Sequence, residues 1–307
     1  MKVIHAAHEL GNGSRKVCVA IGVFDGVHLG HQQIIRQTVA DARQHDALAL
    51  VITFDKHPSA IVAPDRVPPQ IFSRSQKLRA IESLGADALL EIPFDKSFSE
   101  KTGDVFIREL AGGLGKIHSL CVGAHFVFGR KRSGDVELLK KLGAELNFYV
   151  HGLASVSLDG LVVSSTRIRE TIRTGNLDAA SQMLGRPYAI CGLVVAGDRL
   201  GRQLGFPTAN LDATGLVLPP HGVYAGRTKF KEIFYRVALN IGLRPTLATA
   251  KPELRVEAHL LNFTGDLYGA ELEVEISDKL RDERKFGSPT ELREQIAQDV
   301  AAVRRVV

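Results

Sequence analysis

The hydrophobic and polar positions follow two different patterns, one before about residue 186 and one after it. In the first part, uninterrupted apolar runs alternate with longer segments of helical period. The apolar runs predict buried strands at residues 17–21, 48–54, 88–92 and 119–122. The segments between them predict helices at residues 32–45, 73–84 and 102–110. This alternation predicts a Rossmann-like, doubly wound parallel α/β domain over residues 1–186.

After residue 186, short alternating segments and frequent glycine turns replace that pattern. Strand candidates lie at residues 188–195, 222–230, 235–240, 255–263 and 271–277. Because they do not alternate with helices, they predict a small antiparallel β-barrel over residues 187–307. Residues 291–305 predict an amphipathic helix that closes the barrel, with four apolar residues on one side: Leu292, Ile296, Val300 and Val303.

The composition is that of a soluble two-domain protein. The chain has 307 residues, and single cores usually stop growing at roughly 250–300 residues. No apolar run approaches the ~20 residues of a membrane span, and the start lacks the apolar core of a signal peptide. We therefore expect a cytoplasmic protein with no membrane partner. The cysteines Cys18, Cys121 and Cys191 lie in apolar runs, which favours buried thiols over a disulfide or zinc framework.

The net charge of +5 comes from charges interspersed along the chain, and there is no tryptophan or basic-aromatic tract. Nucleic acid is therefore not an expected partner, and small phosphorylated ligands explain the scattered arginines equally well. We expect small-molecule partners and a monomer or weak homo-oligomer.

Residues 22–31, with the sequence GVFDGVHLGH, lie where the first buried strand turns into a helix. His28 and His31 share one face of the first helical turn. Unpaired amides at a helix start attract anions, and Gly30 lets a phosphate approach the backbone. Paired histidines also occur in cores and metal sites, but the strand, glycines and helix favour a phosphate site.

A second helix start, at residues 163–172, points to an anion as well. Ser164, Ser165 and Thr166 supply capping hydroxyls. Arg167 and Arg169 are expected in the first turn, where the helix dipole disfavours cations by roughly 0.3–1 kcal/mol each. A bound anion would reverse this cost, whereas exposed arginines that merely tolerate the dipole are the alternative.

In the second part, residues 197–211 read GDRLGRQLGFPTANL. Their glycines and arginines predict a mobile cationic flap, and Pro207 then stiffens the chain. Thr208 and Asn210 lie two apart, so they face the same side of an extended segment. A hydroxyl and an amide oxygen side by side suit magnesium with nucleotide phosphates, although such pairs also occur in ordinary turns.

Several of these blocks together resemble the bacterial bifunctional riboflavin kinase/FAD synthetases. GVFDGVHLGH resembles the family's H-x-G-H motif, and residues 54–58 resemble its F-x-P-H-P motif. Residues 122–129 resemble V-G-x-D/N-F-x-F-G, and residues 164–169 resemble S-S-T-x-I-R. GDRLGRQLGFPTANL resembles the riboflavin kinase signature, and residues 240–246 and 280–286 also match family blocks. The resemblance extends from about residue 17 to residue 300.

By position, the resemblance implies the site residues. His28, His31 and Arg169 would act in adenylyl transfer, and Glu257 would be the catalytic base of the kinase. Strand alternation places Glu257 opposite the apolar face of its strand, where a solvent-facing glutamate is the alternative. Nucleotide and flavin contacts are implied in the first domain at Gly22, Phe24, Gly30, His57, Gly123, His125, Phe128, Ser164, Ser165 and Thr166. Those implied in the second domain are Gly201, Arg202, Gly205, Thr208, Asn210 and Arg281, with Thr208 and Asn210 as magnesium ligands.

The resemblance implies phosphorylation of riboflavin to FMN in the barrel and adenylylation of FMN to FAD in the α/β domain, with ATP and Mg²⁺ in both steps. An FMN phosphate is already largely a dianion at neutral pH, so it needs no strong base to attack ATP. The riboflavin hydroxyl must lose a proton, and a carboxylate base is expected there.

Two positions depart from the family pattern. Lys56 stands where a proline is usual, and His125 stands where an acidic or amide residue is usual. One alternative is therefore a riboflavin kinase with an impaired adenylyltransferase domain. Another is a flavin-binding or nucleic-acid-binding module without catalysis, against which Thr208, Asn210 and Glu257 argue.

Overall fold

The structure is a computed structural model that describes residues 1–10, 15–197, 200–244 and 253–306. These residues form two compact units. The first unit comprises residues 1–69 and 74–165, and the second comprises residues 70–73 and 166–307. Residues 166–186 therefore group with the second unit. The domain boundary near residue 186 remains a prediction, because it rests on the change from helical to short alternating segments in the sequence.

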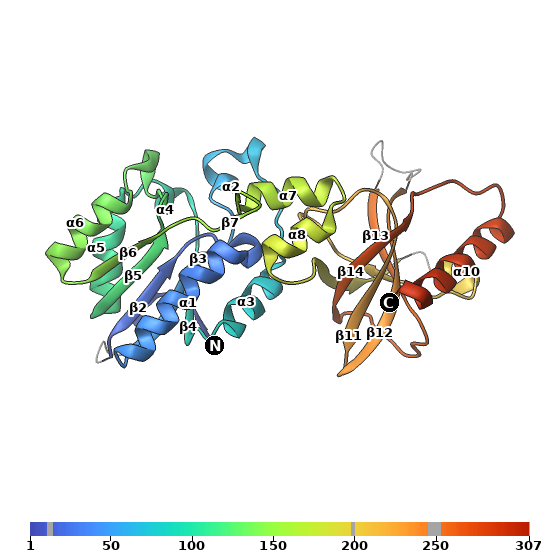
Figure 1. The fold of residues 1–307 in the computed structure, drawn as a ribbon, viewed down its shortest axis with the longest axis horizontal. Helices are drawn as coiled ribbons and strands as arrows, with labels where there is room; N and C mark the ends of the chain where they lie inside the picture. The colour runs from blue at the N-terminus through green and yellow to red at the C-terminus, as the bar shows by residue number, and fades with distance from the viewer. Residues whose placement is uncertain (11–14, 198–199, 245–252, 307) are drawn as a thin grey trace. The chain divides into compact units, whose positions relative to one another are not determined.

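The first unit is built on a six-stranded sheet with the order β1-β4-β3-β2-β5-β6, in which all neighbours are parallel (Figure 1). Four of these strands were predicted, whereas β1 and β6 were not, because one is three residues long and the other has no buried run. The strands are β1 (Lys2–Ile4), β2 (Val17–Ile21), β3 (Leu48–Phe54), β4 (Ala88–Ile92), β5 (Ile117–Gly123) and β6 (Tyr149–Leu153).

Helices cover both faces of this sheet, as the doubly wound prediction requires. Buried alanines of α1 and its following loop pack with Cys18 on one face. Apolar residues of α5 and α6 pack on the other face. The helices are α1 (Leu29–Gln44), α2 (Ser59–Val62), α3 (Arg74–Ser83), α4 (Lys96–Ser99), α5 (Gly103–Leu114) and α6 (Val136–Leu146). A small hairpin, β7 (Ser157–Leu158) and β8 (Leu161–Val162), follows the sheet.

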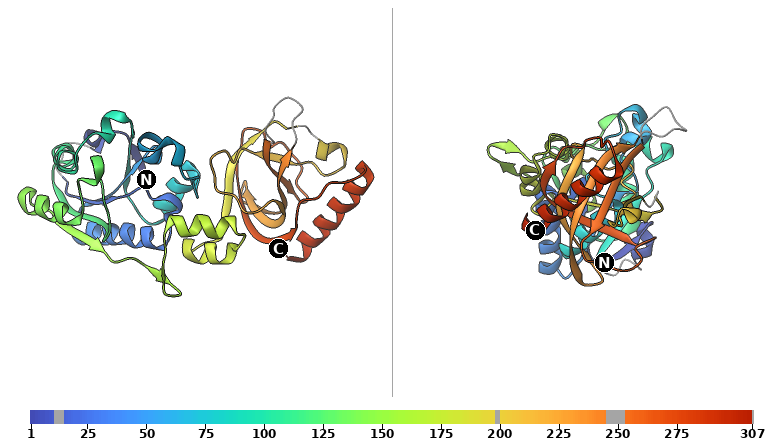
Figure 2. Two further views of the ribbon diagram at one scale, coloured as in Figure 1. Left: turned by 90° about the horizontal axis from the view of Figure 1, so that it is seen from above. Right: turned by 90° about the vertical axis from the view of Figure 1, so that its right-hand side faces the viewer.

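The second unit is a closed six-stranded barrel with the order β10-β13-β12-β11-β14-β9, in which neighbours are antiparallel (Figure 2). Its strands are β9 (Ala189–Val195), β10 (Ala209–Leu211), β11 (Gly222–Phe230), β12 (Ile233–Arg244), β13 (Glu253–Leu260) and β14 (Glu271–Arg281). Its helices are α7 (Ser165–Arg173), α8 (Leu177–Leu184), α9 (Leu200–Gln203) and α10 (Pro289–Val306). The predicted barrel is confirmed.

Helix α10 packs against the barrel strands β11, β12 and β14, as the amphipathic pattern predicts. Val303 is fully buried there with Ala225 and Ala238, and Val300 is partly buried against them. Leu292 and Ile296 are only half-buried and line a cavity. One side of α10 therefore completes the core, and its first turns form the wall of a pocket. The three cysteines are buried and free, as expected.

Candidate functional sites

The candidate site of the first unit lies where the order of the strands reverses. The sheet continues from β2 to β3 and β4 on one side and to β5 and β6 on the other. In doubly wound sheets such a switch point leaves a crevice at the carboxyl ends of the strands, where ligands bind. Residues 22–31 follow β2, and the loop 123–135 begins at Gly123, the last residue of β5 (Figure 1). The topology therefore brings two predicted segments to one edge.

The turn after β2 has a strained backbone. Phe24 and Val27 have positive φ angles of 51° and 38°, and Gly26 between them has a φ of 78°. Such angles are unfavourable for bulky or β-branched residues and are held at functional sites by the surrounding structure. Here the buried amide of Gln32 donates a 2.9 Å hydrogen bond to the carbonyl of Val27. A Cβ at Gly22 would lie 3.0 Å from the Phe24 ring, so this turn is tightly determined.

The two predicted histidines meet at the start of α1. The Nδ1 of His28 accepts a 3.4 Å hydrogen bond from the backbone N–H of His31. Their rings are stacked with centroids 3.6 Å apart, and the fully buried Phe24 contacts His31 at 5.3 Å. Within the described part of the chain, the Nδ1 of His31 is buried without a hydrogen-bond partner. A Cβ at Gly30 would lie 3.3 Å from the His28 ring.

The electrostatics of this pair favour an anion. Burial lowers the pKa of His31 well below its ordinary value, and His28 lowers it further. A neutral His31 thus lies beside the start of α1, where free amides and the helix dipole attract negative charge. A polyphosphate bound here would raise the pKa of His31 again, because it stabilises the protonated ring.

The start of α7 was the second predicted anion site. The Oγ of Ser165 donates a 2.9 Å hydrogen bond to the carbonyl of Asp25, which fixes Ser165 beside the strained turn. Ser164 is half-buried. Arg169 is buried and is the fifth residue of α7, so it lies in the second turn. The expectation that Arg169 lies in the first turn is therefore wrong, and the dipole argument applies only to Arg167.

A cavity of about 550 Å³ lies at the same edge of the sheet. A flat aromatic ring with an anionic tail suits its walls, which combine aromatic and basic side chains. Phe126 and Phe128 are stacked with centroids 5.2 Å apart. The aromatic lining residues are Phe54, Phe94, Phe98, Phe106, Phe126 and Phe128, and the basic ones are Lys101, Arg130, Lys131 and Arg132.

Of the remaining residues that the sequence singled out near this site, one is held by a hydrogen bond and the others are exposed. The Nδ1 of His57 accepts a 3.1 Å hydrogen bond from the backbone N–H of Ser59, so its ring is held at the start of the short helix after β3. Thr166 is exposed. His125 and Lys56, the two departures from the family pattern, are both exposed and do not line the aromatic cavity.

In the barrel, Glu257 lies between two asparagines. Asn210 of β10 pairs with it on one side, and Asn240 of β12 pairs with it on the other. Directly paired residues share a face of a sheet, so these three polar side chains form a row. All three line a cavity of about 340 Å³. Val256 and Ala258 alternate with Glu257 and are buried on the opposite face, as the sequence predicts.

Thr208 and Asn210 separate two cavities. They line the 340 Å³ cavity and also a neighbouring one of about 360 Å³, which Arg202 borders. A Cβ at Gly197 would come within 2.1 Å of the Asn210 amide, and one at Gly201 would lie 3.2 Å from the Thr208 hydroxyl. Both glycines therefore leave room for these side chains. The two oxygens are hard ligands that fit a magnesium ion held by protein and phosphates together.

Arg281 also lines the 340 Å³ cavity, but its guanidinium is engaged. Its Nε and Nη2 donate hydrogen bonds of 2.9 and 2.8 Å to the two carboxylate oxygens of Asp299 in α10. Gln295 donates a further 2.9 Å hydrogen bond to Asp299. Arg281 therefore fixes α10 to β14, and its contact with a flavin stays a prediction. Gly205 has a positive φ of 88° in the turn before Thr208.

Asn240 and four of the cavity phenylalanines were not among the predicted site residues, although Asn240 and Phe54 lie within the quoted motifs. The signal for Asn240 is weak, a single amide within an apolar strand. Its role follows from its pairing with Glu257. The phenylalanines come from separate segments that only the fold brings together: Phe54, Phe94, Phe98 and Phe106. Residues 198–199 of the glycine-rich segment and residues 245–246 of the block beginning at Asn240 lie outside the described residues.

Comparison with known proteins assigns a family to each part of the chain. A family model described as FAD synthetase matches residues 12–167, and one described as riboflavin kinase matches residues 184–307. These matches define a nucleotidyltransferase unit joined to a flavin kinase unit. The chain belongs to the family of bifunctional riboflavin kinase/FMN adenylyltransferases.

Relatives of that name match over nearly their whole length. The protein from Escherichia coli (strain K12) is 37% identical over 99% of this chain and 97% of its own. The protein from Haemophilus influenzae is 36% identical over 98% and 97%. A solved structure titled a macrolide-efflux protein from Streptococcus pneumoniae has a TM-score of 0.83 and 28% identity over 98% of each chain. Among the described residues, no helix combines the length and the apolar character of a membrane span.

Proposed function

We propose that this chain phosphorylates riboflavin to FMN in the barrel unit and transfers an adenylyl group from ATP to FMN in the α/β unit, giving FAD and pyrophosphate. The observation that carries the proposal is that one chain holds two separately built sites, each with its own cavity. The relatives named for both activities cover the whole chain and support it. Because ATP serves both steps, we place the enzyme in the cytoplasm.

In the adenylyl step, the aromatic cavity would bind the isoalloxazine ring, and the nearby basic side chains would attract the FMN phosphate. His28, His31 and the free amides of α1 would hold the ATP phosphates. A phosphate oxygen of FMN attacks the α-phosphorus, and pyrophosphate leaves. Because that nucleophile is already anionic, positioning and charge stabilisation suffice. On the family resemblance, Arg169 also contributes to holding the triphosphate.

In the kinase step, the carboxylate of Glu257 would accept the proton of the riboflavin hydroxyl. The hydroxyl oxygen would attack the γ-phosphorus of ATP, the bond to the β–γ bridging oxygen would break, and ADP would leave. Asn210 and Asn240 flank Glu257 and would orient the hydroxyl and the carboxylate. Thr208 and Asn210 lie between the two cavities, so one cavity can hold flavin and the other nucleotide. Magnesium held by Thr208 and Asn210 would neutralise the phosphate charge.

A kinase with an impaired adenylyltransferase unit is the second candidate, suggested by Lys56 and His125. Both residues are exposed and lie outside the lining of the aromatic cavity. Their placement therefore supports an intact adenylyl-transfer site.

The test is to incubate the purified full chain with riboflavin and Mg-ATP and to separate FMN from FAD. We expect FMN first and then FAD with pyrophosphate. FMN alone would support the impaired form, and bound but unchanged riboflavin would support a binding module. In a variant carrying both His28→Ala and His31→Ala, we expect FMN to accumulate without FAD, while His118→Gln serves as the matched control. Equal loss of both activities in a folded double variant would contradict the two-site proposal.

A further inference from the structure

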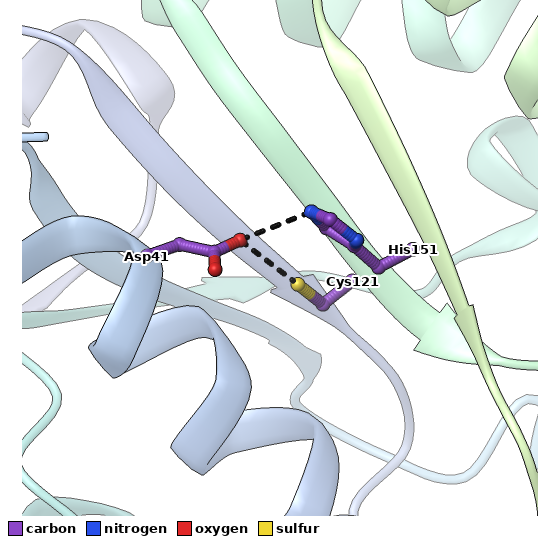
Figure 3. Close-up of side chains that lie close together, drawn as sticks. All are labelled: Asp41, Cys121 and His151. Atoms are coloured by element: carbon purple, nitrogen blue, oxygen red, sulfur yellow. Dashed lines mark hydrogen bonds and ion pairs between the residues drawn. The ribbon is translucent and has the colours of Figure 1, made fainter. Parts of the chain in front are cut away.

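A second cluster of reactive side chains lies in the first unit, within the layer between α1 and the sheet. It consists of Asp41 from α1, Cys121 from β5 and His151 from β6 (Figure 3). Cys121 and His151 are direct partners in the register of the two strands, so their side chains share a face. Asp41 reaches this face from the helix that covers it. The proposed reactions use none of these residues.

The three potential ligand atoms are close together. The Oδ2 of Asp41 lies 3.2 Å from the Nε2 of His151 and 3.9 Å from the Sγ of Cys121. All three atoms lie within 4.8 Å of one another. Ligand atoms around tetrahedral zinc are about 3.3–3.6 Å apart, given metal–ligand distances near 2.0–2.3 Å. The 3.9 Å between the carboxylate oxygen and the sulfur must therefore shorten by a few tenths of an ångström around an ion. His151 can adjust its position because it lies on the edge strand β6 with a 40% exposed side chain.

The carboxylate of Asp41 is held in place by neighbours that are not ligands. Its Oδ2 accepts a 2.8 Å hydrogen bond from the hydroxyl of Ser119, and its Oδ1 accepts a 2.7 Å hydrogen bond from the amide of Gln37. In metal sites, hydrogen bonds from residues that do not bind the ion orient the side chains that do. Asp41 itself is buried, so its position is fixed before any ion arrives.

We propose that Asp41, Cys121 and His151 form a binding site for a zinc-class transition-metal ion, separate from the magnesium that serves the reaction. A divalent ion here would meet one carboxylate, one thiolate and one neutral imidazole, which is a donor set typical of zinc and cobalt. The two anionic ligands would neutralise the ion within a buried layer. The exposed side of His151 leaves a path for entry and a fourth position for water.

Binding of an ion at this cluster would require the loss of a proton from Cys121. Burial raises the pKa of Cys121 to about 12, so without an ion the thiol stays protonated. A bound metal would displace the proton from Cys121, because a coordinating thiol is deprotonated. In the competing interpretation, the cluster is only a hydrogen-bonded network in which His151 and the hydroxyl of Ser119 satisfy Asp41.

The test uses the full chain without nucleotide or flavin and Co²⁺ as a spectroscopic probe. We expect one equivalent of Co²⁺ to produce a thiolate-to-cobalt charge-transfer band, Zn²⁺ to abolish it by displacement, and excess Mg²⁺ to leave it unchanged. Cys121→Ala and His151→Gln should each remove the band or weaken cobalt binding at least tenfold. His151→Gln lies on a half-exposed edge strand, so it tests the site even where Cys121→Ala disturbs folding.

Two matched controls separate this site from other thiols and imidazoles. Cys191→Ala removes a buried thiol of the second unit, and His221→Gln removes an exposed histidine of the same unit. Both should keep the full band. The proposal is overturned if the wild-type chain shows no charge-transfer band with Co²⁺, or if the band survives in both Cys121→Ala and His151→Gln.

Discussion

The ion pair between Arg281 and Asp299 offers a direct test of how α10 forms the wall of the barrel cavity. The perturbation is Asp299→Asn, which keeps the size of the side chain and removes its charge. In the structure, two guanidinium nitrogens contact both carboxylate oxygens at 2.9 and 2.8 Å. The side chains of Arg281 and Asp299 are only 20% and 7% exposed. The variant would therefore leave a mostly buried arginine without its counter-charge.

The expected loss is large for one substitution. Breaking a buried pair by removing one partner costs about 3–5 kcal/mol, and the partial exposure of Arg281 favours the lower end of that range. A loss of ~3 kcal/mol in a unit of this size lowers its melting temperature by roughly 10 °C. Calorimetry of the full chain measures this change in melting temperature. The transition of the barrel unit is the one whose midpoint riboflavin shifts. The KM for riboflavin should also rise, because Leu292 and Ile296 of α10 line the cavity, whereas FMN adenylylation should stay unchanged.

A neighbouring ion pair at the end of β14 supplies a matched control. Lys279 and Asp282 form a 2.6 Å ion pair with side chains 33% and 86% exposed. Exposed pairs contribute little to stability, so Asp282→Asn should change neither the melting temperature nor the KM appreciably. If Asp299→Asn behaves like Asp282→Asn, the ion pair does not hold α10 and the reasoning is refuted.

Three further predictions concern the two sites. Glu257→Gln should reduce FMN formation by about 10²–10⁴-fold while sparing FMN adenylylation, with Glu275→Gln on strand β14 as control, and near-normal kinase turnover would exclude Glu257 as the base. Phe126→Ala should raise the KM for FMN in adenylylation by about 5–150-fold, the equivalent of ~1–3 kcal/mol of stacking, and an unchanged KM would remove Phe126 from the flavin site. Because the pKa of His31 is lowered on folding, the unfolded chain binds one proton more as the pH falls below about 6.5. Unfolding free energies should then fall with pH by up to ~1.4 kcal/mol per unit from this group. His31→Gln should show a shallower slope than the wild-type chain, and an identical slope would contradict the assignment.

The sequence alone predicted those elements whose own residues carry a complete pattern. The strands β2, β3, β4 and β11 have the predicted bounds, because each is an apolar or alternating run between polar or glycine-rich turns. The strand β6 was missed because it lies at the sheet edge and none of its five residues is buried, so it has no buried run. Within the site, His28 and His31 were predictable because three residues along a helix always share a face.

The tertiary structure alone decided which distant residues meet. Asn240 lies beside Glu257 because β12 pairs with β13 in one register, and a shift by one residue would turn Asn240 to the opposite face. Asp299 binds Arg281 because α10 packs on β14, and six phenylalanines share a cavity because separate strands, helices and loops meet at one sheet edge. Periodicity within one element is set by the local backbone, which the sequence specifies directly. The pairing of elements depends on the free energy of the whole core, so no short segment of sequence contains it.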